Sequence, residues 1–298
     1  MQFPPFLKQG DTVGIIATAR SVEPQSINRG VEWLSSHGLK VKFGKNLFSS
    51  FHQFGGDDTE RLSDLQWALD DKDLKAIWVA RGGYGTLRIL DRIDFTKFSA
   101  APKWLIGFSD VTALHSLIQK KCKIATLHAP MPFSLEGQVE ALKKMRDLLF
   151  GDLSGYDLKW DSLNKMGKGT GILVGGNLSL LYALSGTFAD IDTRDKILFI
   201  EDVDEYLYHL DRMILNLKFS GKLSHLNGLV CGGFSNMKDH STPFGMSPQE
   251  IILDAVKEFN YPVCFGFSAG HLKPNFPLVL GGNCELIITA SNCHLRYV

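Results

Sequence analysis

The chain has 298 residues, of which 44% are hydrophobic and 21% are charged, a composition typical of globular proteins. Lys and Arg together number 32, and so do Asp and Glu, so no net charge favours binding to nucleic acid or to an anionic membrane surface. No apolar run reaches the ~18 residues that a membrane-spanning helix needs. The length exceeds that of most single domains, so we expect two domains.

The cysteines and the N-terminal segment indicate the cellular compartment of the protein. The cysteines are odd in number and follow no metal-binding spacing; they are Cys122, Cys231, Cys264, Cys284 and Cys293. We therefore expect reduced thiols in a cytoplasmic protein, with neither a metal nor a cofactor. Residues 1–6 lack the basic and apolar segments of a signal peptide, which agrees with this location.

Strands and helices alternate through the first 150 residues, a pattern typical of a doubly wound parallel α/β sheet. The apolar run 12–17 predicts the first, central strand, and a helix over 24–36 and a strand over 40–43 follow it. Asp57 and Glu60 have the spacing of a capping box, so we expect a helix to begin there.

A glycine-rich loop follows the strand predicted over 76–80. Its sequence, Arg81-Gly82-Gly83-Tyr84-Gly85, lets the backbone approach a ligand closely and point N–H groups at it. Three interpretations stay open: a phosphate or dinucleotide site, an oxyanion-binding loop beside the next strand, or a plain tight turn. The spacing matches neither common nucleotide-binding glycine motif, which counts against the first interpretation.

Ser109 lies between a strand predicted over 104–106 and a helix that begins at Asp110. A serine on such a turn projects from the edge of a sheet, close to the first amides of the helix, as the nucleophile of an α/β-hydrolase does. The match to the pattern G-x-S-x-G is partial, because Val111 replaces the second glycine. The alternative is that Ser109 only caps the helix, a role that serine often has.

A composition change suggests where the first domain ends. A strand over 124–128 and a helix over 139–149 precede residues 151–171, which are polar, rich in glycine and without clear periodicity. We therefore expect an N-terminal α/β domain over 1–150, a linker over 151–171 and a C-terminal domain over 172–298.

The second part again alternates strands with helices and ends in β structure. The predicted strands cover 172–177, 196–202, 226–231, 263–267, 278–280 and 285–289. Helices are predicted over 178–184 and 209–217. A third helix begins after Ser247, where Pro248 and Glu250 complete a helix-start signal.

Three residues that can form a catalytic triad lie at the predicted carboxyl ends of strands: Ser109, Glu201 and His271. In a triad the imidazole takes the serine proton, while the acid orients the imidazole and stabilises its charged form. Each residue alone has a plainer explanation, as a helix cap, a surface ion pair or a solvated loop histidine. Asp202 and the carboxylates after it could suggest a metal site, but their spacing fits no calcium-binding loop.

Seven segments, in this order, resemble the LD-carboxypeptidase family of serine peptidases, which includes the microcin-immunity peptidases. They are Gly10–Ala17, Ala80–Gly85, Gly107–Thr112, Gly175–Leu178, Ile197–Asp202, Leu210–Met213 and Gly270–Asn275. The resemblance runs nearly from end to end of the chain. It implies a flavodoxin-like N-terminal sheet that carries the nucleophile and a C-terminal domain that supplies the acid and the base.

The same resemblance implies roles for single residues. It places the nucleophile on Ser109, the acid on Glu201 and the base on His271. It places the oxyanion hole on backbone amides, those of Asp110 and Gly83. It also implies a homodimer.

The implied reaction is hydrolysis of an L,D amide bond that releases terminal D-alanine from a muropeptide tetrapeptide during cell-wall recycling. A carboxypeptidase must recognise a terminal carboxylate, and Arg81 is the candidate because a guanidinium fork matches a carboxylate. One alternative is a hydrolase of peptidyl or aminoacyl nucleotide conjugates, in the manner of the microcin-immunity branch. Another is a muropeptide-binding protein without catalysis. We expect no nucleic-acid or membrane partner.

Overall fold

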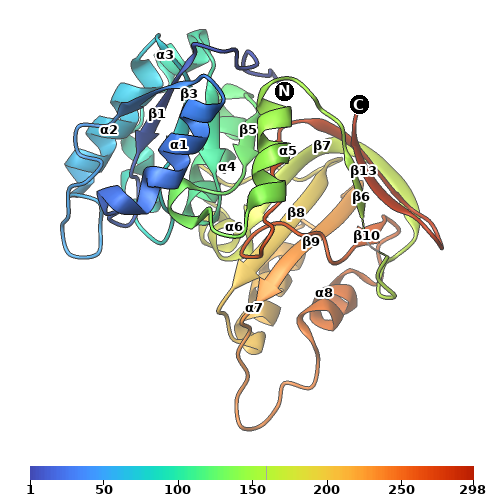
Figure 1. Cartoon of the computed structure of the whole chain (residues 1–298). Coiled ribbons are helices and arrows are strands. Elements are labelled where there is room, and N and C mark those ends of the chain that lie inside the picture. The colour runs from blue at the N-terminus through green and yellow to red at the C-terminus, as the bar shows by residue number, and fades with distance from the viewer. Residues whose placement is uncertain (159) are drawn as a thin grey trace.

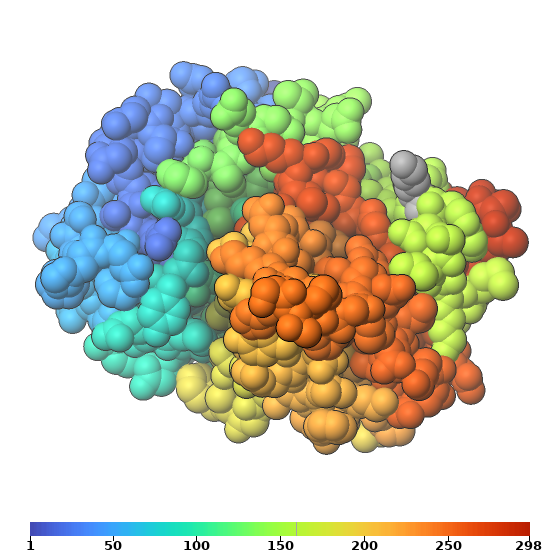
Figure 2. Space-filling view, turned by 90° about the horizontal axis from the view of Figure 1, so that it is seen from below, coloured from blue at the N-terminus to red at the C-terminus, as the bar shows by residue number. Residues whose placement is uncertain are grey.

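The computed structural model describes residues 1–158 and 160–298, which fold into an α/β structure built on two sheets. In Figure 1 the first sheet and its helices form the blue-to-green part at upper left, and the second sheet lies to the right and below. Seen from below, the two parts meet along a furrow in the molecular surface (Figure 2). The predicted α/β class is confirmed.

The first sheet has six strands in the order β11-β5-β4-β3-β1-β2. They are β1 (Thr12–Ile16), β2 (Lys40–Phe43), β3 (Leu74–Val79), β4 (Trp104–Gly107), β5 (Thr126–His128) and β11 (Leu278–Leu280). Strands β1 to β5 are parallel, and their order, 2-1-3-4-5, is that of a flavodoxin-like sheet. The loops after β1 and β3 therefore lie at the topological switch point, where sheets of this kind bind ligands.

Helices cover both faces of this sheet. They are the α-helices α1 (Asn28–Ser36), α2 (Asp58–Asp70), α3 (Thr96–Ala100), α4 (Thr112–Cys122) and α5 (Val139–Leu149), with the 3-10 helices η1 (Pro24–Ile27), η2 (Thr86–Arg92), η3 (Ser109–Val111) and η4 (Pro132–Ser134). Residues of α1 and α5 pack with Trp78 and Trp104, whereas those of α2, α3 and α4 pack with Ile77 and Leu105. Because successive strand residues point to opposite faces, β3 and β4 contribute to both cores.

Two helix starts that the sequence predicts are confirmed. Asp57 accepts a hydrogen bond from the backbone N–H of Glu60 over 2.8 Å, and the Glu60 carboxylate accepts one from the backbone N–H of Asp57 over 2.9 Å. Ser247 and Glu250 form the same reciprocal pair before Pro248. Such a capping box satisfies amides that the first helical turn leaves without partners, so it fixes where each helix begins.

The second sheet has seven strands in the order β10-β9-β8-β7-β12-β13-β6. The strands are β6 (Tyr156–Leu158), β7 (Gly167–Asn177), β8 (Ile197–Val203), β9 (Gly228–Ser235), β10 (Val263–Cys264), β12 (Asn283–Ile288) and β13 (Cys293–Tyr297), and the helices of this part are α6 (Leu178–Leu184), α7 (Leu207–Phe219) and α8 (Pro248–Val256). Strands β7 to β10 are parallel, and the remaining strands continue the sheet antiparallel. The helices pack on one face of the parallel strands.

Three predicted elements differ from the structure. Residues 151–171, expected to be a linker, contain β6 and the first part of β7, because residues 167–171, in which half-buried glycines alternate with exposed polar residues, pair antiparallel with β12. The strand predicted over 263–267 ends at Cys264, because Gly266 has a φ of +73° and leaves the extended conformation. After the glycine loop, the spacing of Leu87, Leu90 and Ile93 predicts a helix, and the structure has the 3-10 helix η2 there.

One segment of the C-terminal half belongs to the first sheet. Strand β11 pairs antiparallel with β5, with Leu278 opposite His128 and Leu280 opposite Thr126. The loop before β11 carries His271 and therefore runs from the second sheet to the first. Within the part of the chain that the structure describes, none of the helices combines the length and the apolar character needed to cross a bilayer.

Candidate active site

The turn between β4 and α4 presents Ser109 to the C-terminal half. Ser109 has a φ of +62°, in the left-handed region that serine rarely adopts. Its Oγ lies 3.2 Å from Nε2 of His271. The N-cap positions of η3 and α4 are Phe108 and Val111, so Ser109 is not the helix cap of the alternative interpretation. A sharp, strained strand-to-helix turn is the geometry that exposes a nucleophile at the top of a sheet.

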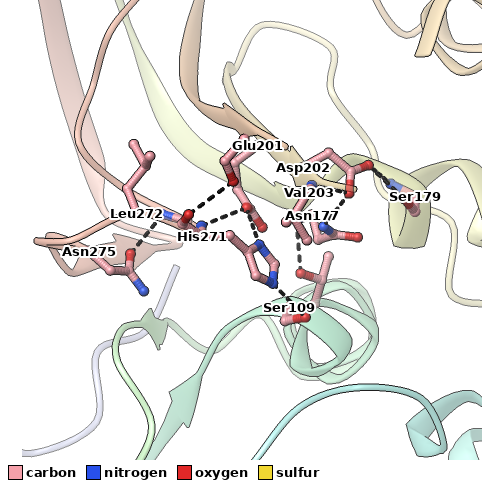
Figure 3. Close-up of polar contacts among 12 residues, drawn as sticks. Ser109, Asn177, Ser179, Glu201, Asp202, Val203, His271, Leu272 and Asn275 are labelled. Carbon is pink, nitrogen blue, oxygen red and sulfur yellow. Dashed lines mark hydrogen bonds and ion pairs between the residues drawn. The ribbon is translucent and has the colours of Figure 1, made fainter. Parts of the chain in front are cut away.

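His271 lies between Ser109 and Glu201 (Figure 3). Its Nδ1 lies 2.7 Å from Oε2 of Glu201, and its backbone N–H donates to the same oxygen over 3.2 Å. We assign the ring proton to Nδ1, because the carboxylate accepts there. This leaves the Nε2 lone pair directed at the Ser109 hydroxyl. The structure thus brings together three side chains that the sequence analysis singled out in separate parts of the chain.

Two opposing effects act on the pKa of His271. Burial lowers it, while the Glu201 carboxylate and, to a smaller extent, that of Asp202 raise it, and the net direction is upward from 6.5. Glu201 is fully buried, so its attraction for the imidazolium is only weakly screened. The pair therefore stabilises the imidazolium that forms when the base accepts a proton.

Asp202, the next residue after Glu201, holds the start of α6. Its carboxylate accepts hydrogen bonds from Nδ2 of Asn177 over 2.9 Å and from Oγ of Ser179 over 2.6 Å (Figure 3). Burial raises the pKa of Asp202 to about 6. Among residues 1–158 and 160–298, no cluster of His, Cys, Asp or Glu side chains is arranged to hold a metal ion.

The glycine loop after β3 lies against the nucleophile. A Cβ atom on Gly82 would come 3.4 Å from Oγ of Ser109, which is van der Waals contact. Gly83 has a φ of +111°, and a Cβ atom there would come 2.7 Å from Cδ of Arg20, so this position requires glycine. The loop is therefore next to the hydroxyl, as the oxyanion interpretation requires.

Asp110 connects the glycine loop to the nucleophile turn. Its buried carboxylate accepts a hydrogen bond over 2.9 Å from the backbone N–H of Thr86, which follows the last glycine of the loop. Burial raises the pKa of Asp110 to about 6. The two amides expected to form the oxyanion hole, those of Gly83 and Asp110, thus lie on two segments that this side chain holds together.

Arg81, the predicted carboxylate-binding residue, lies at the entry to the glycine loop. Its Nη1 donates to the carbonyl of Ser21 over 3.0 Å, and its guanidinium stacks 4.0 Å above the ring of Phe133. Burial, followed by the charge of Arg20, lowers the pKa of Arg81. These contacts engage one N–H group and one face of the guanidinium, which leaves other N–H groups for a ligand.

Some residues that surround the base were not predicted from the sequence. The ring of Phe108 lies 5.0 Å from that of His271, and Oδ1 of Asn275 accepts a hydrogen bond from Gly270 over 2.7 Å. Gln138, in the N-terminal half, is hydrogen-bonded to the backbone of the His271 loop. Asn275 ends one of the family-like segments and could have been singled out. A lone glutamine before a helix carries no comparable signal.

Comparison with known proteins agrees with this geometry. Residues 13–129 match the model of the LD-carboxypeptidase N-terminal domain, and residues 170–286 match that of the LD-carboxypeptidase C-terminal domain. A relative from Bacillus subtilis, described as a probable murein peptide carboxypeptidase, is 36% identical over 289 residues, which cover 95% of this chain and 91% of the relative.

Solved structures share the whole fold. The muramoyltetrapeptide carboxypeptidase of Oxalobacter formigenes has a TM-score of 0.86 at 28% identity and covers 96% of this chain and 98% of its own. The microcin C7 self immunity protein MccF has a TM-score of 0.87 at 22% identity and covers 98% of both chains. The second likeness concerns the fold alone.

Proposed function

Because the chain belongs to the LD-carboxypeptidase family of serine peptidases, we propose that it hydrolyses an L,D amide bond and releases the terminal D-alanine of a muropeptide tetrapeptide. One observation carries the proposal: Ser109, His271 and Glu201 form a continuous chain of hydrogen bonds. The names of the relatives, which refer to murein and muramoyl peptides, support the choice of substrate. Such a reaction belongs to cell-wall recycling.

In the first half of the reaction, Oγ of Ser109 attacks the carbonyl carbon of the L,D amide bond. Nε2 of His271 accepts the serine proton as the new C–O bond forms. Glu201 holds the ring through Nδ1 and stabilises its positive charge. His271 then protonates the amine of D-alanine, the C–N bond breaks, and an acyl-enzyme ester remains on Ser109.

In the second half, water takes the place of the amine. His271 accepts a proton from the water as its oxygen attacks the ester, and then returns a proton to Oγ of Ser109. In both halves the carbonyl oxygen becomes negative, and the amides of Gly83 and Asp110 are the proposed donors to it. Loss of one such donor typically removes about 3 kcal/mol of transition-state stabilisation.

The substrate's terminal carboxylate lies only three bonds from the scissile carbonyl carbon, so its partner must lie close to Ser109. We assign this role to Arg81, which precedes Gly82, the residue at which a Cβ atom would meet Ser109. The guanidinium is held in place by the Ser21 carbonyl and the Phe133 ring, so little further ordering is needed when it binds a carboxylate.

An experiment can distinguish two alternative functions from the proposed one. A hydrolase of peptidyl or aminoacyl nucleotide conjugates would use the same triad, and MccF shares the fold at an identity too low to indicate the substrate. A muropeptide-binding protein without catalysis would bind a tetrapeptide and leave it intact. The hydrogen-bonded triad favours an enzyme.

The proposal includes a cytoplasmic homodimer that takes a small peptide as its substrate. The family resemblance implies the dimer, and the cysteines, all present as free thiols, suit a reducing compartment. Light scattering on the purified protein measures the mass of the assembly and decides between monomer and dimer.

The decisive experiment is hydrolysis of a disaccharide tetrapeptide by the wild type and by Ser109→Ala, with released D-alanine followed by mass spectrometry. Release by the wild type alone supports both the reaction and the nucleophile. Release by both proteins would show that Ser109 is not the nucleophile. Release by neither, combined with cleavage of an aminoacyl nucleotide conjugate, would assign the chain to the microcin-immunity type of activity.

A further inference from the structure

The base of the proposed triad lies on a loop that a side chain from the other half of the molecule holds. Gln138 precedes α5 in the N-terminal half and is 4% exposed. Its Nε2 donates to the carbonyl of Leu272 over 3.2 Å, and its Oε1 accepts from the backbone N–H of Asn275 over 2.7 Å. The two contacts flank residues 273 and 274, and the first of them, at Leu272, is on the residue that directly follows His271.

The chemistry of this contact requires a neutral amide. One oxygen accepts and one nitrogen donates, so the Gln138 side chain pairs with the loop backbone as a neighbouring strand would. A carboxylate could accept from Asn275 but could not donate to Leu272, and an apolar side chain could do neither. Because the site is buried, a backbone group that loses its partner there would lose hydrogen-bonding energy that water does not restore.

The two hydrogen bonds of Gln138 with Leu272 and Asn275, which we call the Gln138 clamp, connect to the triad through further hydrogen bonds. Oδ1 of Asn275 accepts from the backbone N–H of Gly270 over 2.7 Å, and the backbone N–H of His271 donates to Oε2 of Glu201 over 3.2 Å. On the other side of the loop, Oγ of Ser235 donates to the His271 carbonyl over 3.0 Å. Backbone groups on both sides of the imidazole are therefore fixed.

Gln138 is itself rigidly placed. Its backbone N–H donates to the carbonyl of Leu135 over 3.2 Å, and its carbonyl accepts from the N–H of Leu142 at the start of α5 over 2.8 Å. Helix α5 packs on the same sheet whose strand β4 leads to Ser109. Ser109 and Gln138 thus belong to the N-terminal packed unit, while His271 lies on a loop that comes from the second sheet.

From this arrangement we infer that Gln138 is a positioning residue, which sets the distance between His271 and Ser109 by tying the loop of the base to the unit that carries the nucleophile. The inference rests on the proposed function only for the identity of the reaction. The placement of the imidazole can be measured without any substrate.

The test compares Gln138→Met with the matched control Gln119→Met. Gln119 is 3% exposed, also lies in the N-terminal half, and neither atom of its side-chain amide has a hydrogen-bond partner among the described residues. Two readouts are needed: the pKa of the His271 imidazole by NMR in the free enzyme, and kcat and KM for D-alanine release. Thermal unfolding of each variant gives the folded fraction to which the rates are normalised.

We expect Gln138→Met to lower kcat about 10- to 100-fold per folded molecule, with a smaller change in KM, because a misplaced base reduces the rate more than binding. The pKa of His271 should fall, since a loose loop weakens its contact with Glu201. Gln119→Met should change neither readout. Gln138→Glu, which retains the acceptor but turns a carboxylate oxygen toward the Leu272 carbonyl in a buried site, should lower kcat at least as much as Gln138→Met.

A Gln138→Met protein with the His271 pKa and the normalised kcat of the Gln119→Met control would overturn the inference, even if its melting temperature were lower. Absence of D-alanine release from the wild type would overturn the proposed function instead. In that case the NMR titration alone still decides whether Gln138 positions the imidazole.

Discussion

Gly270 lies directly against the carboxylate of Glu201. A Cβ atom on Gly270 would come 2.3 Å from Oε2 of Glu201, the oxygen that accepts both hydrogen bonds from His271. Gly270 also has a φ of +97°, which a residue with a side chain adopts at a cost. Both the contact and the conformation therefore require glycine before the base.

Gly270→Ala should displace Glu201 from His271 and lower kcat/KM by about 100-fold or more, because misplacement by about 1 Å can have that effect. The matched control is Gly221→Ala, whose φ is +75° but whose Cβ atom would meet nothing within 4 Å. Both variants should lose stability through backbone strain, and only Gly270→Ala should lose activity. Equal activity of the two variants would contradict the assignment.

The left-handed backbone of Ser109 predicts a difference between two inactive variants. Ser109→Ala keeps the strained φ of +62°, whereas Ser109→Gly relieves it. We expect Ser109→Gly to be more stable than Ser109→Ala by about 1 kcal/mol, the strain less the extra entropy of glycine in the unfolded chain. Urea denaturation measures the difference. If Ser109→Ala were the more stable protein, the inference that the backbone at Ser109 is strained would be wrong.

The ion pair of His271 and Glu201 predicts the acid limb of the rate profile. The pKa of His271 is raised from 6.5, so the decrease of kcat/KM on acidification should begin at a pH above 6.5. There the imidazole becomes protonated and can no longer act as a base. Glu201→Gln removes the charge, so the acid limb should move to lower pH while the maximal rate falls. A limb that stays in place would exclude His271 as the titrating group.

The same ion pair acts on stability in the opposite direction. A histidine whose pKa is higher in the folded than in the unfolded state contributes stability that is fully present below pH 6.5 and is lost as the pH rises through the raised value. The difference in unfolding free energy between wild type and Glu201→Gln should therefore shrink from pH 6 to pH 9. Chemical denaturation at these pH values measures it.

His128 has the opposite dependence. Its buried ring packs edge-on between Phe108 and Phe199, and burial, followed by the charges of His115 and His271, lowers its pKa well below 6.5. Below pH 6.5 the unfolded chain binds a proton at His128 and the folded chain does not. The free energy of unfolding therefore decreases as the pH is lowered. His128→Phe should remove about one proton from that slope. An unchanged slope would contradict a neutral His128.

Arg81 can be tested by changing the substrate rather than the protein alone. Arg81→Ala should lower kcat/KM for a tetrapeptide with a free terminal carboxylate by about 10-fold or more, as loss of a charge-assisted hydrogen bond does. A tetrapeptide that ends in D-alaninamide should be a poor substrate for both proteins and should distinguish them little. If Arg81→Ala lowered kcat/KM by the same factor for both substrates, Arg81 would not bind the terminal carboxylate.

Local signals allowed much of the fold to be predicted. The helices over 139–149 and 178–184 and the strands over 40–43 and 278–280 occur with the expected bounds, because hydrophobic spacing and end signals are written in neighbouring residues. Residues 151–171 lacked such a pattern, since β6 has only three residues and the first part of β7 alternates glycine with exposed polar residues.

The site divides in the same way. Ser109, Glu201 and His271 could be singled out because each lies at the carboxyl end of a predicted strand and in a family-like segment, although their meeting depends on the packing of two sheets. Gln138 could not be found, since its partners lie more than 130 residues away and are backbone atoms, which have no sequence signature.

Strand β11 has a consequence for synthesis and for evolution. Its hydrogen bonds with β5 complete the first sheet with residues translated about 150 positions after β5. A nascent chain that ends near residue 150 would hold β5 as an open edge, which invites pairing with other chains until Leu278–Leu280 arrives. Recombination between relatives near residue 150 would replace β11 together with the second sheet, so the first sheet would then contain one strand from the other parent.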